Sequence, residues 1–252
     1  MKFENRLVLS AMAGINNAEF CNRQKASLVI LGGFNADKNT MDAARAVVAR
    51  GRKEFVFDDP LLGIEMELRK IRKNFAVNVR SSTLEGYLET AKLVDSYGGI
   101  IEINAHCRQP EFVLARCGEW LLFNPEKLFE IVEKVSRIAI TAVKLRGGHR
   151  IDYERLCTKL FEKGCSALHI DAMIPNGGCD LFLLQRISKI GFTIGNNSFV
   201  DRESGERMIR SGAKMVSAAR AVLRDANFFE KMLESRILSE PVVMETKTVN
   251  WS

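Results

Sequence analysis

The residues with the clearest chemical potential follow an apolar stretch at residues 100–103. An amide, an imidazole and a thiol come directly after it, at Asn104, His106 and Cys107. An amide at the end of a buried strand must find partners or cost on the order of 1–3 kcal/mol, so Asn104 is stronger evidence of a site than a single thiol. A buried strand that ends in reactive side chains is typical of a scaffold that carries its chemistry at one end of a sheet.

Polar side chains also end two later apolar stretches. Lys144 and Arg146 follow the stretch at residues 140–143, where the apolar neighbours of the lysine favour a buried anionic partner over a solvated one. His169 and Asp171 end the stretch that begins at residue 167. His169 fits a core histidine with satisfied hydrogen bonds as well as it fits a ligand-binding one.

Two segments near the end of the chain are candidates for binding a phosphate. Gly195, Asn196 and Asn197 follow one apolar stretch, and Ala219 and Arg220 follow the next. Loops in these positions of a barrel often bind phosphate through backbone N–H groups, and an arginine adds charge. Gly-Asn-Asn is also an ordinary turn sequence.

Eight short apolar or β-rich segments must position these side chains. They lie at residues 7–10, 28–31, 75–79, 100–103, 140–144, 167–171, 192–195 and 215–218. Between them the apolar spacing changes to three and four, as at Leu128, Ile131, Val132 and Val135, which is the pattern of a helix that covers a sheet. Strand and helix alternate eight times, and the strands are apolar on both faces. This pattern predicts an α/β fold, a single parallel (β/α)8 TIM barrel, over a doubly wound sheet with fewer strands.

Boundaries and capping can be predicted as well. Pro125 is placed to begin a helix, with Asn124 ahead of it as the cap. Because no proline-rich or low-complexity linker divides the chain, we expect one barrel domain over residues 1–236. Residues 237–252 are expected to form a C-terminal tail.

Composition limits the class of protein. The chain has 252 residues, 46% of them hydrophobic, and no apolar stretch long enough to cross a bilayer or to act as a signal peptide, so we expect a cytoplasmic protein with no membrane partner. The six cysteines lack zinc-finger spacing and are expected to be free thiols, with no metal site. Residues 45–80 hold nine Lys or Arg against five Asp or Glu, which favours a solvated helix face over a polyanion-binding patch.

Six motifs, in the same order, resemble those of the tRNA-dihydrouridine synthases, which are FMN-dependent barrels. Residues 10–14 are similar to the family's Ala-Pro-Met-Ala-Gly, 102–107 to Asp-Ile-Asn-x-Gly-Cys-Pro, and 121–125 to Leu-Leu-x-x-Pro. Residues 142–146 are similar to Val-Lys-Ile-Arg, 168–169 to the start of Val-His-Gly-Arg, and 195–197 to Gly-Asn-Gly. The resemblance covers roughly residues 5–230.

The resemblance implies a function and a set of site residues. Cys107 would be the catalytic acid that protonates a uracil ring while reduced FMN delivers hydride, and an ordinary thiol is mostly protonated at neutral pH. NADPH or NADH would be the reductant, and tRNA or a small pyrimidine the substrate. The residues implied to contact the cofactor are Ala11, Met12, Asn78, Asn104, Lys144, His169, Gly195, Asn196, Ala219 and Arg220.

The chain departs from the family in several places. His106 and Arg108 replace the glycine and proline beside the catalytic cysteine, and the arginine of His-Gly-Arg is missing. Ala219 stands where the family has glycine, which a negative φ would allow. The helical RNA-binding domain that follows the barrel in the family is expected to be lacking, which would leave fewer phosphate contacts.

Two other functions remain open. A dihydroorotate dehydrogenase-like flavoenzyme would also place a Cys after an Asn-bearing strand and a Lys on a neighbouring strand. A degenerate barrel without catalysis would explain the altered motifs. The sequence indicates no oligomeric state.

Overall fold

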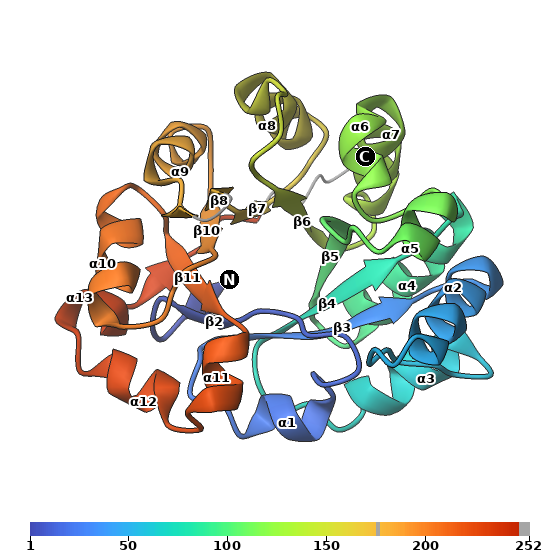
Figure 1. The fold of residues 1–252 in the computed structure, drawn as a ribbon, viewed down its shortest axis with the longest axis horizontal. Helices are drawn as coiled ribbons and strands as arrows, with labels where there is room; N and C mark the ends of the chain where they lie inside the picture. Colours follow the sequence, from blue (N-terminus) through green and yellow to red (C-terminus); the bar gives the residue numbers. More distant parts are fainter. Residues whose placement is uncertain (175–176, 247–252) are drawn as a thin grey trace.

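The computed structural model describes residues 1–174 and 177–246, and eight parallel strands form a closed barrel at its centre (Figure 1). Around the barrel the order is β10-β11-β2-β3-β4-β5-β6-β7. The strands are β2 (Leu7–Leu9), β3 (Leu28–Asn35), β4 (Phe75–Arg80), β5 (Ile100–Ala105), β6 (Ile140–Arg146), β7 (Ala167–Asp171), β10 (Thr193–Asn196) and β11 (Met215–Ala218). The predicted (β/α)8 barrel is confirmed.

Helices surround the barrel on its outside (Figure 1). The longer ones are α2 (Lys38–Ala49), α3 (Pro60–Leu68), α4 (Leu84–Ser96), α7 (Pro125–Val135), α8 (Tyr153–Glu162), α9 (Leu181–Ser188) and α10 (Arg202–Arg210). The shorter ones are α1 (Ala18–Asn22), α5 (Pro110–Leu114), α6 (Trp120–Phe123), α11 (Arg220–Arg224), α12 (Phe228–Leu233) and α13 (Arg236–Ser239). A small hairpin, β8 (Met173–Ile174) and β9 (Gly178–Cys179), follows β7.

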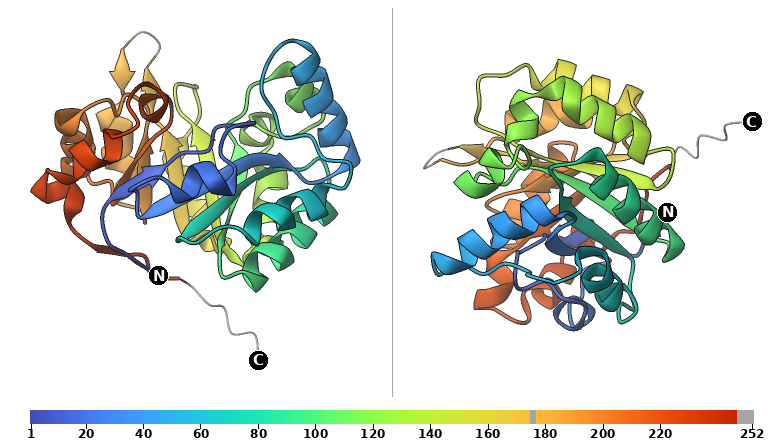
Figure 2. Two further views of the ribbon diagram at one scale, coloured as in Figure 1. Left: turned by 90° about the horizontal axis from the view of Figure 1, so that it is seen from below. Right: turned by 90° about the vertical axis from the view of Figure 1, so that its right-hand side faces the viewer.

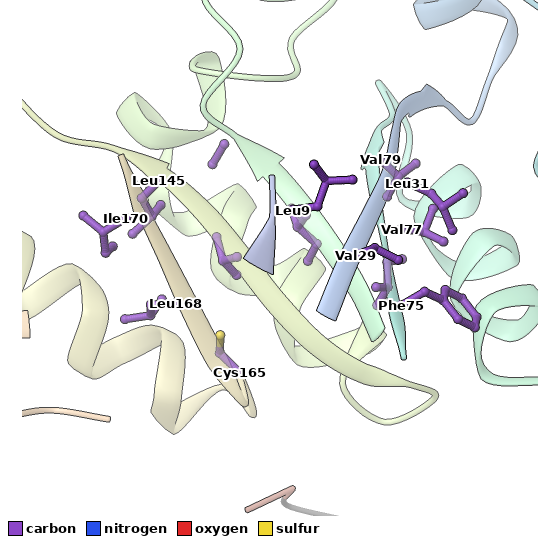
Figure 3. Packing of buried hydrophobic residues seen from close by; sticks show 14 of the residues in the cluster. Leu9, Val29, Leu31, Phe75, Val77, Val79, Leu145, Cys165, Leu168 and Ile170 are labelled. Atoms are coloured by element: carbon purple, nitrogen blue, oxygen red, sulfur yellow. The ribbon is translucent and has the colours of Figure 1, made fainter. Parts of the chain in front are cut away.

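The two faces of each strand are buried in different places. Alternate residues such as Val29, Leu31 and Val77 point outward and pack under the helices (Figure 3). The residues between them point into the barrel, where Val8 and Ile30 belong to a second apolar cluster. Because both faces are buried, the strands are apolar throughout, which made them recognisable in the sequence.

Side-chain caps set the starts of several helices. The Asp37 side chain accepts from the N–H of Thr40 at the start of α2, and Asp201 does the same for Ser204 at the start of α10. Helix α7 begins at Pro125 with Asn124 at the N-cap position, as predicted, but without the side-chain hydrogen bond that is typical of a cap. The Asn124 side chain donates instead to the carbonyl of Trp120 and makes no capping hydrogen bond.

The two ends of the described chain meet below the barrel, at the end where the strands begin (Figure 2). Strand β1 (Lys2–Phe3) pairs with β12 (Val242–Val243). Phe3, Val242 and Met244 are buried in the same cluster as Val8 and Ile30. In the described part of the region expected to be a tail, the chain therefore packs against the barrel and closes its floor.

The expectations from composition can be compared with the structure. All six cysteines are free thiols. Most cations of residues 45–80 have partners: Arg50 binds Glu111, Arg69 binds Glu65, and Lys73 donates to backbone carbonyls. Within the described residues, the helices are too short or too polar to cross a membrane, and His, Cys, Asp and Glu side chains form no group that could hold a metal.

Candidate functional site

A cavity of about 530 Å³ opens at the end of the barrel where the strands finish. Three larger hollows lie elsewhere: two, of about 710 and 660 Å³, around helices α6, α7 and α8, and one, of about 620 Å³, near the starts of β2, β3 and β4. We take the first as the candidate site because inward-facing side chains from several strands converge on it. The predicted site residues that line it are Ala11, Met12, Asn78, Asn104, Cys107, Lys144 and Arg220.

Asn104 holds the loop that carries Cys107. Its side-chain oxygen accepts hydrogen bonds from the backbone N–H of His106, at 3.0 Å, and of Cys107, at 2.8 Å. The Asn104 side chain points into the barrel because it lies two residues after Glu102, on the same face of β5. Asn104 was predicted to need hydrogen-bond partners because it lies at the end of a buried strand. It finds them in the backbone of His106 and Cys107, and so fixes the conformation of that loop.

A chain of hydrogen bonds runs from Asn104 into the barrel. The Asn104 amide donates to Asn78 Oδ1 at 2.8 Å, and the Asn78 amide donates to Glu102 Oε1 at 2.6 Å. The other Glu102 oxygen lies 2.6 Å from His169 Nδ1, and His169 Nε2 lies 2.7 Å from the hydroxyl of Ser217. Every described member of this chain is buried.

The charge of Glu102 is stabilised within this chain. Burial by itself raises the pKa of a carboxyl group, but the interaction with His169, the charge of Lys144 and the hydrogen bond from Asn78 hold the pKa of Glu102 below its ordinary value. Burial, followed by the charge of Lys144, lowers the pKa of His169. An ionised Glu102 beside a neutral His169 follows, with the carboxylate accepting from Nδ1–H.

His169 lies one layer below the cavity. Both of its ring nitrogens are bonded within the protein, to Glu102 and Ser217, and its side chain is fully buried. It does not line the cavity. The structure therefore places His169 as a support for the Asn78 and Asn104 amides, and its direct contact with a cofactor stays a prediction.

Lys144 reaches the cavity from β6. It is 4% exposed, and its Nζ donates to the Ser10 hydroxyl at 2.5 Å. Burial lowers the pKa of Lys144, while the carboxylates of Glu102 and Asp171 oppose that shift. Lys144 pairs in register with Asn104 on one side and with His169 on the other, so neighbouring strands bring these predicted residues to one place.

The structure adds a buried ion pair that the sequence did not indicate as part of the site. Arg80, at the end of β4, binds both oxygens of Glu54, at 2.5 and 3.2 Å, and stacks on the ring of Phe112. Its Nη1 also lies 3.6 Å from Cys107 Sγ. The available signal was the spacing of two between Asn78 and Arg80, which puts both on the inner face of one strand.

The two predicted phosphate segments follow neighbouring strands, β10 and β11, but only one of their residues reaches the cavity. Arg220 lines the cavity, but Gly195, Asn196 and Ala219 do not. A Cβ on Gly195 would lie 3.1 Å from Leu184, on the side of the outer helices. Ala219 has φ −125°, so alanine fits there without strain, and Asn197 adopts a φ of +85° where the related motif has glycine.

Comparison with known proteins shows the fold. No protein-family model matches this chain. An uncharacterized protein of Methanocaldococcus jannaschii is 29% identical over 242 residues, which cover 88% of this chain and 91% of that protein.

Two solved structures are similar over most of the chain. Morphinone reductase in complex with tetrahydroNAD has a TM-score of 0.62 and 12% identity, covering 95% of this chain and 89% of the other. The dihydroorotate dehydrogenase of Eimeria tenella in complex with ferulenol has a TM-score of 0.63 and 13% identity, covering 91% and 80%. These likenesses agree with the single (β/α)8 barrel.

Proposed function

We propose that this chain is an FMN-dependent oxidoreductase that exchanges hydride with a uracil-like ring, with Cys107 as the proton donor in ring reduction. One observation carries the proposal: Asn104, Cys107 and Lys144 converge on one cavity at the mouth of the barrel. The likeness of the fold to morphinone reductase and to a dihydroorotate dehydrogenase, both FMN enzymes, supports it. The finer resemblance to the tRNA-dihydrouridine synthases is part of the proposal.

The donors around the cavity fit a flavin. The Asn78 and Asn104 amides each use one N–H inside the protein and keep a second, and Lys144 keeps two of its three after bonding Ser10. Such donors suit the carbonyl and ring-nitrogen acceptors of an isoalloxazine. A cavity of about 530 Å³ is within the usual size of small-molecule sites.

Each residue has a role that follows from its position. When bound, FMN would supply the hydride. Lys144 would place a positive charge beside the ring, where it stabilises an anion in a site shielded from water. Asn104 would fix the Cys107 loop, and the Cys107 thiol would give its proton to the substrate carbon. NADPH or NADH is the proposed reductant, and the morphinone reductase structure contains a nicotinamide analogue.

The rim of the cavity favours an anionic substrate. Arg52, Lys53, Arg108 and Arg220 line it and are exposed, and none of them forms an ion pair within the described chain. Glu54, the one carboxylate among the lining residues, is engaged by Arg80. We propose that one or two of these cations hold the FMN phosphate and that the others contact a phosphate of tRNA, the leading substrate.

A spectrum tests the cofactor. Purified protein is expected to show flavin absorption, or to acquire it when incubated with micromolar FMN, and NADPH or NADH is expected to bleach it in the absence of oxygen. Cys107→Ala should keep the colour but lose turnover, whereas Lys144→Met should weaken FMN binding. A colourless protein that takes up no FMN would exclude the proposal.

A second candidate is a flavoenzyme for a small free pyrimidine. The similarity in fold to a dihydroorotate dehydrogenase, and the Lys144 and Asn104 pair on adjacent strands, favour it. Reduction of the bound flavin by dihydroorotate, with no conversion of uridine in tRNA, would select this candidate. The opposite pattern would select the synthase-like reaction.

A further inference from the structure

Two of the departures from the family motifs lie in direct contact. His106 replaces the motif glycine before Cys107, and Asp171 occupies the position of the missing arginine two residues after His169. Although 65 residues apart in sequence, His106 Nε2 and Asp171 Oδ2 are 2.5 Å from each other. His106 and Asp171, which both differ from the family motifs, are thus in contact with each other at the mouth of the barrel.

Asp171 fixes how the His106 ring is protonated. An ionised carboxylate only accepts hydrogen bonds, so the ring nitrogen facing it, Nε2, carries the proton. Arg146 Nη1 lies 3.4 Å from the same Asp171 oxygen and 3.3 Å from His106 Nε2. Because a guanidinium group only donates, the much shorter contact with Asp171 decides that Nε2 carries the proton, and Arg146 donates to the carboxylate. Asp171 thus keeps its charge, and burial, which would raise its pKa, is overcome by His106, Lys144 and Arg146, which bring the pKa to about 2.

The other ring nitrogen is open to a ligand. His106 Nδ1 has no hydrogen-bond partner in the described chain. It is also absent from the set of fully buried polar atoms without a partner, so it is accessible to solvent. His106 lines the cavity, with 26% of its side chain exposed. A neutral ring protonated at Nε2 presents a lone pair at Nδ1, so this nitrogen is a hydrogen-bond acceptor.

Burial and the neighbouring cations keep the ring neutral. Burial is the largest effect and lowers the pKa of His106, and Lys144 and Arg146 on β6 lower it further, against the opposing effect of Asp171 on β7. His169, below it on β7, is the remaining ionisable ring nearby and is itself held neutral. At neutral pH Nδ1 therefore accepts a hydrogen bond and does not donate one.

We propose that His106, held by Asp171, is a specificity-determining residue whose Nδ1 accepts a hydrogen bond from a ring N–H of the substrate. The inference rests on the proposed function and narrows its substrate to rings with an imide N–H. Uracil presents such a group at N3, whereas cytosine presents a bare acceptor nitrogen there. A fixed acceptor thus admits the first ring and leaves two lone pairs facing each other with the second.

Nucleoside binding to the FMN-loaded protein tests the proposal. Uridine is expected to bind at least about tenfold more tightly than 3-methyluridine, which lacks the N–H, and than cytidine. His106→Phe should remove this preference. The matched control is His149→Phe, because His149 also pairs with a carboxylate, Glu119 at 2.9 Å, but does not line the cavity.

Two further readouts separate this role from a merely structural one. Uridine affinity should fall as pH drops through the pKa of His106, since protonation turns Nδ1 into a donor. The chain has three histidines, so NMR can follow that titration directly. Asp171→Asn should release the ring into its other tautomer and shift the preference toward cytidine.

The outcomes are distinguishable from those for the cofactor. Equal affinity for uridine and 3-methyluridine, a preference unchanged in His106→Phe, or no uridine binding beside normal FMN binding would overturn the role of His106. Failure to bind FMN would refute the proposed function, and the same nucleoside titrations on the cofactor-free protein would still decide whether His106 selects the N–H.

Discussion

Asp171 carries a buried negative charge at the mouth of the barrel, and its effect on stability depends on pH. Its pKa is lowered from 3.8 to about 2, so its contribution is complete above about pH 4 and is lost as the pH falls toward 2. We predict that Asp171→Asn lowers the unfolding free energy by about 2 kcal/mol at pH 7. Urea titrations should show this difference shrinking at pH 3.

An exposed carboxylate provides the control. Asp58 is exposed, so Asp58→Asn should change the unfolding free energy little, and equally at both pH values. A pH-independent effect of Asp171→Asn would show that the ordering of His106 does not depend on the aspartate charge.

Glu102 has a different role, because its two oxygens face two donors. We predict that Glu102→Gln destabilises the protein by about 1–3 kcal/mol, since one N–H of the new amide must face the amide of Asn78 or the ring of His169. Thermal unfolding measures the loss. Glu89→Gln, at an exposed surface pair with Lys92, should cost far less.

At the scale of elements, strand β10 contains Gly195, and a substitution can decide whether this glycine contacts a phosphate or packs against the outer helices. Its resemblance to a phosphate motif predicts a cofactor contact, but a Cβ at Gly195 would meet Leu184, Met208 and Ala213 under the outer helices. We predict that Gly195→Val lowers stability by about 1–3 kcal/mol through overpacking. FMN affinity, measured by fluorescence titration under conditions where the variant is folded, should stay within about twofold, which corresponds to less than RT. A large loss of affinity would restore the phosphate role.

The positions of the strands were predictable because their residues are apolar on both faces. The residues at which the strands end were not predictable. Strand β3 runs on to Asn35, four residues past the predicted end, through Gly32 and Gly33. The glycine pair interrupts the apolar pattern without interrupting the strand, because it lies where the register with β4 shifts. Sequence pattern therefore located this strand but shortened it.

The sequence predicted those residues of the candidate site that can be recognised from their own strand alone. Asn104 and Lys144 stand at strand ends, and their position alone marked them. The His106–Asp171 and Arg80–Glu54 pairs join distant segments, and no local pattern reveals such contacts. His169 was predicted at the cavity but lies deeper, because the period of two puts Asp171, not His169, at the mouth.

At the scale of the whole molecule, the floor of the barrel depends on the far ends of the described chain. We predict that removing residues 241–252 lowers the melting temperature by several degrees, because Phe3 and the barrel interior lose the cover of Val242 and Met244. Differential scanning calorimetry measures the change. FMN binding at the opposite end should persist at low temperature, and its loss there would show that the two ends are coupled.

The charge distribution makes a prediction about RNA. If the cations at the rim contact tRNA phosphates, affinity should fall steeply with salt, and the double variant Arg52→Ala/Lys53→Ala should reduce the slope of log K against log salt by about one to two. Filter binding at several salt concentrations measures both slopes. Arg23→Ala/Lys92→Ala, on exposed helix surfaces away from the cavity, is the control, and equal slopes for the two variants would contradict rim binding.

The pairing of β1 with β12 also bears on protein engineering. The amino group of Met1 lies 2.8 Å from the carbonyl of Met244, so a short linker could join the two ends of the described chain beneath the barrel. New termini could then be opened in an exposed loop on another side without changing which strands are neighbours. The order of strands around the closed barrel therefore does not depend on where the chain begins. Circularly permuted versions should fold into the same barrel, with the same residues around the cavity.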